Sequence, residues 1–210
     1  MLPGVFSFPG WRMKKVAVFI DGGHLRACAR SAGRGFSVDF IIRVAKSAVQ
    51  AGEELFRIQY FDCDPFSGTV KLPVSGASKT YTGNDRLLSE LAREELVAVR
   101  RGVLKFRGWE RTKMSLQAGT PAAALTDSDF RAKWEQKGVD LRIGLDIVTM
   151  TESRAAELIV LVTGDTDLIP AMKLARGRGL QLAGLDLPNR KIVPELKPHL
   201  DFFRQLATWP

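Results

Sequence analysis

The sequence of 210 residues has little of what zinc proteins and secreted proteins use most. It contains two cysteines, Cys28 and Cys63, and two histidines, and no two cysteines are spaced as CxxC. This scarcity argues against a zinc site and against a disulfide framework. Long apolar runs are also missing, since none approaches the roughly 20 residues that cross a bilayer. We therefore expect a cytoplasmic protein that does not enter a membrane.

The start of the chain lacks the features of a secretory signal. Its first residues, MLPGVFSFPGWR, are apolar, but they have no basic beginning and are interrupted by Pro9-Gly10. We expect an N-terminal arm over residues 1–13 and a single domain over residues 14–205. A chain of this length can bury one sizeable core.

Acidic residues are outnumbered by basic ones. The chain has 31 Lys and Arg against 23 Asp and Glu, which gives a net charge of +8. This balance favours a polyanionic partner such as nucleic acid, although a basic surface can also serve solubility alone. The shares of hydrophobic residues (45%) and charged residues (26%) are those of an ordinary globular protein.

Short apolar runs alternate with stretches of helical periodicity. Strands are expected at residues 15–20, 56–61, 96–99, 157–163 and 181–185, and helices at residues 39–51, 85–94, 139–150 and 168–176. The alternation predicts a three-layer α/β/α (Rossmann-like) domain around a mainly parallel sheet. Asp39 is expected to cap its helix. Residues 63–84 are interpreted as a loop, and residues 100–136 show no clear pattern.

Aspartates stand where the expected strands end. Asp21, Asp62 and Asp165 follow strands, and the carboxyl ends of parallel strands share one edge of the sheet. The helices that contain Asp140 and Asp167 begin on the same edge. Carboxylates gathered in one place repel one another and need protons or a cation. An oxygen-only ligand set suits Mg²⁺ or Mn²⁺.

We therefore predict a metal site formed by four aspartates, with a fifth nearby. The predicted ligands are Asp21, Asp140, Asp165 and Asp167. Asp146 lies six residues after Asp140, so it cannot share an ion with it as a helix neighbour; it is expected deeper, orienting a ligand or a water molecule.

Each of these aspartates has a structural alternative. Asp21 and Asp165 suit turns, whereas Asp140 and Asp167 suit helix N-caps. Asp146 could pair with Arg142 one helical turn earlier. Four aspartates at one sheet edge favour a functional site over this alternative.

Other residues near the same edge are candidates for supporting roles. Thr163 places a hydroxyl beside Asp165, and His24 opens a helix whose amides could meet a phosphate. Both are interpreted as residues around the metal ligands, with a plain helix-start role as the alternative for His24. Lys137 could contact a phosphate or could simply be solvated.

The segment RRGVLKFRGWERTK, residues 100–113, combines basic and aromatic side chains. Arg101, Lys105 and Arg107 are predicted to bind single-stranded RNA by charge, with stacking from the aromatic residues. The alternative is a solvated edge strand with Phe106 and Trp109 in the core.

Three stretches, VAVFIDGGHL, KGVDLRIGLDIV and LIVLVTGDTDLIPAMKLARGRG, occur in this order. Together they resemble the NYN domain family, in its LabA-like branch of the PIN-like nucleases. The resemblance implies a PIN-like fold and metal-dependent ribonuclease activity. It implies that Asp21, Asp140, Asp165 and Asp167 match the acidic positions of the family. Asp146 matches a further position within the family's helix. His24 stands where the family commonly has Asn.

The resulting hypothesis is a metal-dependent endoribonuclease that acts on RNA, and a homodimer is left open. A non-catalytic RNA-binding or regulatory module with the same fold is the main alternative. A phosphatase of the haloacid-dehalogenase type would need an acid where Gly23 stands. Dinucleotide binding is disfavoured because no GxGxxG follows the first strand.

Overall fold

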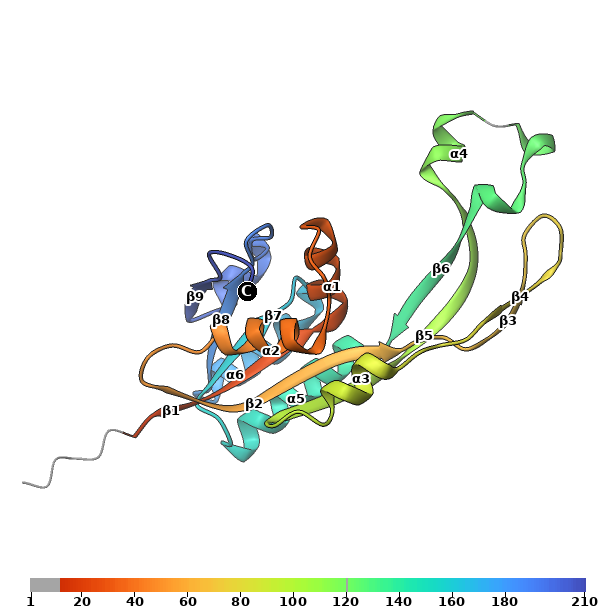
Figure 1. Ribbon diagram of the computed structural model, residues 1–210. Helices are drawn as coiled ribbons and strands as arrows, with labels where there is room; N and C mark the ends of the chain where they lie inside the picture. The colour runs from red at the N-terminus through yellow and green to blue at the C-terminus, as the bar shows by residue number, and fades with distance from the viewer. Residues whose placement is uncertain (1–11, 120) are drawn as a thin grey trace, which may run out of the picture.

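Seven strands form one central sheet in the computed structural model, which describes residues 12–119 and 121–210. Their spatial order is β6-β5-β2-β1-β7-β8-β9, and every neighbouring pair is parallel except β5 and β6 (Figure 1). The strands are β1 Lys14–Asp21, β2 Glu53–Asp64, β5 Val97–Arg111, β6 Phe130–Lys137, β7 Leu158–Val162, β8 Gln181–Asp186 and β9 Phe202–Gln205. The predicted α/β class with a mainly parallel sheet is confirmed, and two more strands than expected join the sheet.

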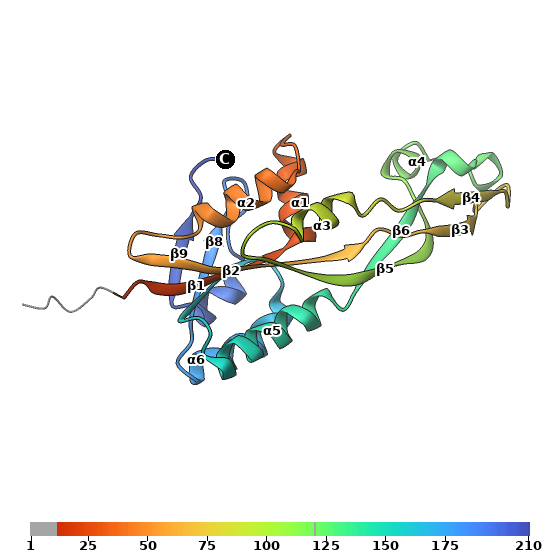
Figure 2. The ribbon, with the colours of Figure 1, turned by 60° about the horizontal axis from the view of Figure 1, so that its bottom comes forward.

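Helices cover both faces of this sheet, which gives three layers (Figure 2). One face carries α1 (Gly22–Ser31), α2 (Val38–Ser47) and α3 (Arg86–Leu91), and the other carries α5 (Val139–Ser153) and α6 (Ile169–Gly177). Successive residues of a strand point to opposite faces. Val18 therefore packs in the core under α1 and α2, whereas Phe19 packs in the core under α5 and α6.

The crossover helix α2 begins earlier and ends earlier than expected. Ser37 caps it, because its hydroxyl accepts from the backbone N–H of Phe40 at 3.2 Å. The prediction of Asp39 as the cap is wrong; Asp39 lies in the first turn and pairs with Arg43 at 2.8 Å. The helix ends at Ser47, so residues 49–52 are left to turn the chain into β2.

Two hairpins project together from one end of the sheet (Figure 1). β5 continues twelve residues beyond the predicted end at 99, and β6 pairs with it antiparallel. We call residues 103–137 the projecting hairpin; its far end holds α4 (Lys113–Gln117) and two short 3-10 turns, Ala122–Ala124 and Asp127–Asp129. The second hairpin, β3 (Gly68–Lys71) with β4 (Ser78–Tyr81), lies in the stretch expected to be a loop.

Aromatic side chains join the two hairpins. Phe106 and Trp134 are opposite each other across β5 and β6, with ring centroids 5.6 Å apart. Phe66 lies 5.1 Å from Trp134, and Trp109 donates from Nε1 to the carbonyl of Lys71 at 2.8 Å. Phe106 and Trp109 thus pack in a local aromatic cluster and not in the main core, which corrects that alternative.

Helix α5 follows the projecting hairpin directly. Gly138 occupies the N-cap position with φ +76°, a left-handed conformation that favours glycine. Arg142 reaches back from the next turn and donates to the carbonyl of Gly138 at 2.7 Å. Asp140 is the second residue of the helix, so its alternative role as the N-cap is wrong.

Within residues 12–119 and 121–210, no helix combines the length and the apolarity needed to cross a bilayer. The predicted N-terminal arm lies almost entirely outside the described residues, and the domain limits stay a prediction.

Candidate functional site

The ends of β1 and β7 form the centre of the site. The two strands are parallel neighbours, with Ile20 opposite Val162, so Asp21 and Thr163 emerge side by side at the carboxyl edge. Thr163 is 7% exposed; its hydroxyl donates to Asp21 Oδ2 at 3.5 Å and accepts from the backbone N–H of Asp165 at 3.1 Å. One threonine thus connects the first acidic residue to the loop that carries the next two.

Asp21 and Asp165 also serve the backbone. Asp21 Oδ1 accepts from the N–H of His24 at 3.0 Å and caps α1. Asp165 Oδ1 accepts from the N–H of Asp167 at 2.9 Å and caps the 3-10 turn Thr166–Leu168 that leads into α6. Asp165 is therefore the cap in this turn, and the alternative that assigned capping to Asp167 is wrong. Capping uses one oxygen of each carboxylate, and the second oxygen of Asp21 accepts from Thr163. A carboxylate has about four lone-pair sites, so both side chains keep acceptor capacity for a ligand.

The charges of the other three predicted aspartates act on Asp140. The pKa of Asp140 is raised to about 6, first by partial burial, then by the charge and hydrogen bond of Asp165, and further by the charges of Asp21 and Asp167. Burial also raises the pKa of Asp21. In the part of the chain that the structure describes, none of the four forms an ion pair with Lys or Arg.

The chemistry of this cluster suits a hard divalent cation. All four groups are carboxylates, and within residues 12–119 and 121–210 none of them pairs with Lys or Arg; a cation bound by oxygen ligands would remove their mutual repulsion. The side chains are not yet arranged as a closed shell, because no group of three or more Asp, Glu, His or Cys among the described residues is placed to hold a metal ion. The donor set fits the ion, and binding would require the carboxylates to turn toward one point.

The raised pKa of Asp140 gives a testable pH dependence. Asp140 loses its proton at a pKa of about 6 in the folded state, compared with 3.8 in the unfolded chain. The stability that protonation provides is therefore complete below pH 3.8 and is lost as the pH rises through 6. The variant Asp140→Asn should lack this loss. In EDTA, the urea midpoint of the variant should therefore rise relative to the parent between about pH 4 and about pH 7. An equal difference at both pH values would contradict the coupling.

Asp146 is engaged elsewhere. Its carboxylate accepts two hydrogen bonds from Arg100 of β5, at 2.7 Å and 3.2 Å, and its side chain is only 14% exposed. The alternative pairing with Arg142 is wrong, because Arg142 bonds to the carbonyl of Gly138. Asp146 thus ties α5 to β5, and its predicted role in orienting a ligand or a water stays a prediction.

The His24 side chain lies against the loop after β7. A Cβ atom at Gly164 would be 3.0 Å from His24 Cε1, so glycine lets the ring pack closely. Burial lowers the pKa of His24, although the charge of Asp21 opposes this effect. A neutral ring is consistent with a contact of 3.8 Å between its Nε2 and the sulfur of Cys28.

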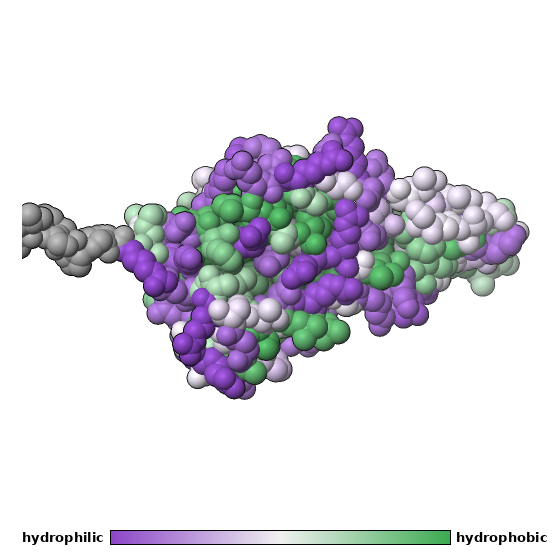
Figure 3. All heavy atoms as spheres, turned by 90° about the horizontal axis from the view of Figure 1, so that it is seen from below, coloured by the Kyte–Doolittle hydropathy of each residue, from purple (hydrophilic) through white to green (hydrophobic). Residues whose placement is uncertain are grey.

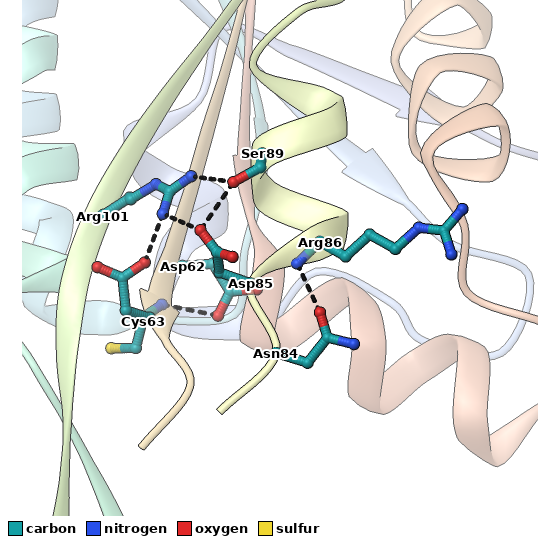
Figure 4. Close-up of polar contacts among 8 residues, drawn as sticks. Asp62, Cys63, Asn84, Asp85, Arg86, Ser89 and Arg101 are labelled. Carbon is teal, nitrogen blue, oxygen red and sulfur yellow. Dashed lines mark hydrogen bonds and ion pairs between the residues drawn. The ribbon is translucent and has the colours of Figure 1, made fainter. Parts of the chain in front are cut away.

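The predicted RNA-binding residues differ in how strongly they are bound to other residues of the protein. Arg101 is bound to Asp64 and Asp85, each at 2.9 Å, and to Ser89 at 3.1 Å (Figure 4). Arg107 and Lys137 both pair with Glu135. Lys105 is exposed and lies opposite Glu135 on the same ladder.

The far end of the projecting hairpin is paler, and so less hydrophilic, than the body of the molecule seen from below (Figure 3). Basic residues nevertheless occur along its whole length, from Lys105 and Lys137 near the sheet to Lys113 and Arg131 toward its end.

Three sets of contacts near the site had no clear signal in the sequence. Asp62, which the strand pattern places at this edge, is 1% exposed and bonds to Arg26 and to the hydroxyl of Tyr60. Gln136 reaches the start of α1, where a Cβ at Gly23 would lie 3.0 Å from its Oε1 and 3.3 Å from Asp21 Oδ1.

The third set lies at the turn after β8. Asn189 donates to the carbonyl of Cys28 at 2.9 Å, which places the exposed Arg190 beside α1 and His24. Only proximity in the fold brings these residues to the acidic cluster.

The sequence model of the NYN domain matches residues 15–205. The chain belongs to the NYN domain family. The NYN domain is PIN-like, which agrees with the sheet order and layers described above and indicates a nuclease or RNA-related function. The match covers all of the acidic residues of the site.

Two individual proteins are similar to this NYN domain. A protein of unknown function from Vibrio parahaemolyticus has a similar structure, with a TM-score of 0.52 and 15% identity over 93% of this chain and 94% of that chain. This likeness concerns the fold alone. A curated protein from Burkholderia cepacia, described as glutathione reductase, is 27% identical over 128 residues, which are 56% of this chain and 28% of that protein. The chain therefore spans little more than a quarter of that relative.

Proposed function

We propose that this NYN domain is a metal-dependent endoribonuclease whose reaction centre is the cluster of Asp21, Asp140, Asp165 and Asp167. The observation that carries the proposal is the coupling of four carboxylates at the carboxyl edge of β1 and β7, where no described Lys or Arg pairs with them. A protein normally avoids such a cluster, because the like charges destabilise the fold. Its presence is explained if a cation and a phosphodiester bind there.

The four aspartates would hold Mg²⁺ or Mn²⁺. When bound, the ion would supply positive charge for the scissile phosphate and make water a stronger nucleophile. The chain itself contributes the placement: Thr163 orients Asp21 and the loop of Asp165, and capping fixes the carboxylate of Asp165. A neutral His24 beside Gly164 would line the entry without adding charge.

Basic residues lie on both sides of the cluster. Lys137 ends β6 three residues before Asp140, and Lys105 shares its ladder, whereas Arg190 lies beyond β8 on the other side. Neighbouring strands are about 4.8 Å apart, and their carboxyl ends form one continuous edge. A strand of RNA would cross this edge from the projecting hairpin, over the acidic cluster, to the turn after β8. Arg101 supports the scaffold better than it supports RNA binding, given its three internal partners.

Incubation of the purified protein with labelled single-stranded RNA tests the proposal. Cleavage should appear with Mn²⁺ or Mg²⁺ and vanish in EDTA. A protein that binds this RNA but leaves it intact with every divalent ion would instead be a non-catalytic RNA-binding module, which the excess of basic residues also favours. The LabA-like branch, a cytoplasmic location and a homodimer stay predictions.

The basic residues of the projecting hairpin give a second test. The double variant Lys105→Ala/Lys137→Ala should weaken RNA binding in EDTA and reduce the slope of log affinity against log salt by about 1 to 2, since each lost phosphate contact spares about one counterion. Lys46→Ala is a matched control, because Lys46 is an exposed residue of α2 away from the hairpin. An unchanged slope in the double variant would remove the hairpin from the RNA path.

A further inference from the structure

A cavity of about 290 Å³ lies between the end of β2, α1, α3, β5 and β6. One of its lining residues, Gln136, reaches Gly23 next to Asp21 of the acidic cluster. Its polar lining includes Arg26, Asn84 and Gln136, and its apolar lining includes Leu87, Leu88 and Leu104. A site with apolar walls and a few polar groups is typical of small-molecule and base recognition.

The guanidinium of Arg26 is held in place in this cavity. It bonds to Asp62, which is 1% exposed and also accepts from the hydroxyl of Tyr60 at 3.1 Å. Its other side stacks over the ring of Phe36, 5.3 Å from the centroid. The side chain of Arg26 is still 35% exposed, so its remaining N–H groups can reach a ligand. A buried carboxylate thus fixes a cationic donor at the cavity wall.

Asn84 is fixed by the start of α3 (Figure 4). Its Oδ1 accepts from the backbone N–H of Arg86 at 2.9 Å, which leaves its Nδ2 group as a donor. Arg101 bonds to both Asp64 and Asp85 and so holds the end of β2 against this turn. The internal role of Arg101 therefore keeps Asn84 in place.

Gln136 separates the cavity from the acidic cluster. Its amide lies over Gly23, with both the amide oxygen and Asp21 Oδ1 within 3.3 Å of the position of a Cβ atom there. A nucleotide whose phosphate reaches Asp21 would therefore have its base close to Gln136.

We propose that this cavity binds one nucleobase of single-stranded RNA, in the nucleotide next to the scissile phosphate. The inference rests on the proposed function for its position beside the reaction centre. Arg26 and Asn84 offer donors and Gln136 offers both a donor and an acceptor, so the cavity suits a base edge with oxygen or ring-nitrogen acceptors, such as guanine O6 and N7. The leucines would contact the faces of the base.

The test compares two labelled octamers in EDTA: a mixed-sequence single-stranded RNA, and an octamer of the same backbone without bases. The double variant Asn84→Ala/Gln136→Ala should bind ordinary RNA about 10-fold more weakly than the parent, which is about 1.4 kcal/mol, and bind the abasic octamer equally well. Arg26→Lys keeps a charge beside Asp62 but loses the planar fork, so it should show the same base-specific loss.

Gln205→Ala is the matched control, because it removes an exposed amide on the far edge strand β9. It should leave both affinities unchanged. Equal weakening of both octamers by the double variant would assign these residues to the backbone and overturn the base pocket. Unchanged binding, or a parent that does not distinguish the octamers, would overturn it too.

The outcome is separable from the proposed activity. A base-specific loss of binding in the variants, with no RNA cleavage by the parent, would support the base pocket and contradict the proposed ribonuclease activity. Cleavage by the parent with unchanged binding by the variants would keep the ribonuclease and remove the pocket.

Discussion

Replacing Asp165 with asparagine should lower RNA cleavage by more than about 100-fold, because even the outer partners of metal ligands contribute 10- to 100-fold. The substitution is mild for the fold. The amide side chain of the variant would keep an oxygen for the N–H of Asp167, so the cap of the turn before α6 survives. It would also remove one charge from the cluster that raises the pKa of Asp140. In EDTA, the variant should therefore melt at the temperature of the parent or above it.

Thermal melts with EDTA and with Mn²⁺, run beside the cleavage assay, provide the control. The parent should gain more from Mn²⁺ than Asp165→Asn does, since a ligand that binds only the folded state raises its stability. RNA binding in EDTA should be preserved in the variant. If Asp165→Asn melts far below the parent in EDTA, and the parent cleaves nothing with any divalent ion, these aspartates are turn and cap residues.

Replacing Arg204 with alanine should destabilise the fold by about 3 to 5 kcal/mol, a large share of the stability of a typical domain. Arg204 of β9 bonds to both carboxylate oxygens of Glu53, at 2.9 Å and 2.5 Å, and to the carbonyl of Ala48. The two side chains are only 5% and 9% exposed. Without Arg204, the charge of Glu53 would be buried and unpaired.

Urea unfolding of the parent and of Arg204→Ala measures this loss. The matched control is Arg43→Ala, which breaks an exposed pair with Asp39 one helical turn away and should cost about 0.5 kcal/mol or less. The double variant Glu53→Gln/Arg204→Met should recover most of the stability, because both buried charges are gone. A loss in Arg204→Ala no larger than the control would show that solvent reaches this pair.

The parallel body of the fold could be predicted because its strands are buried on both faces. Runs such as LIVLV are continuous and apolar, and each ends at a turn, so both the apolar pattern and the length of the run indicate a buried strand. The projecting hairpin gave no such signal. Gly108, at φ +92°, lies in a register shift between Phe106 and Trp109, and this shift breaks the alternation that identifies a strand. The hairpin depends on contacts with Phe66 and Tyr81, from residues far earlier in the chain.

The acidic cluster could be predicted from topology alone, since each aspartate follows a strand or begins a helix on one edge. Which aspartate caps the turn could not be predicted, because this depends on which residue has non-helical φ and ψ angles: Asp165 caps and Asp167 does not. The cavity beside Asp62 was also out of reach. Its lining residues come from α1, β2, α3, β5 and β6 and from the residues between β2 and α3, and no local pattern joins them.

Only Gly138 lies between β6 and α5, so the length of the projecting hairpin does not affect the position of Asp140. Residues added in pairs at the far end of an antiparallel ladder leave the pairing at its base unchanged. Lys137 would stay beside Val103, and Asp140 would keep its place in the first turn of α5. The length of the hairpin could therefore vary among proteins with this fold. The length of RNA that each protein contacts would vary with it. The reaction centre would not have to be rebuilt.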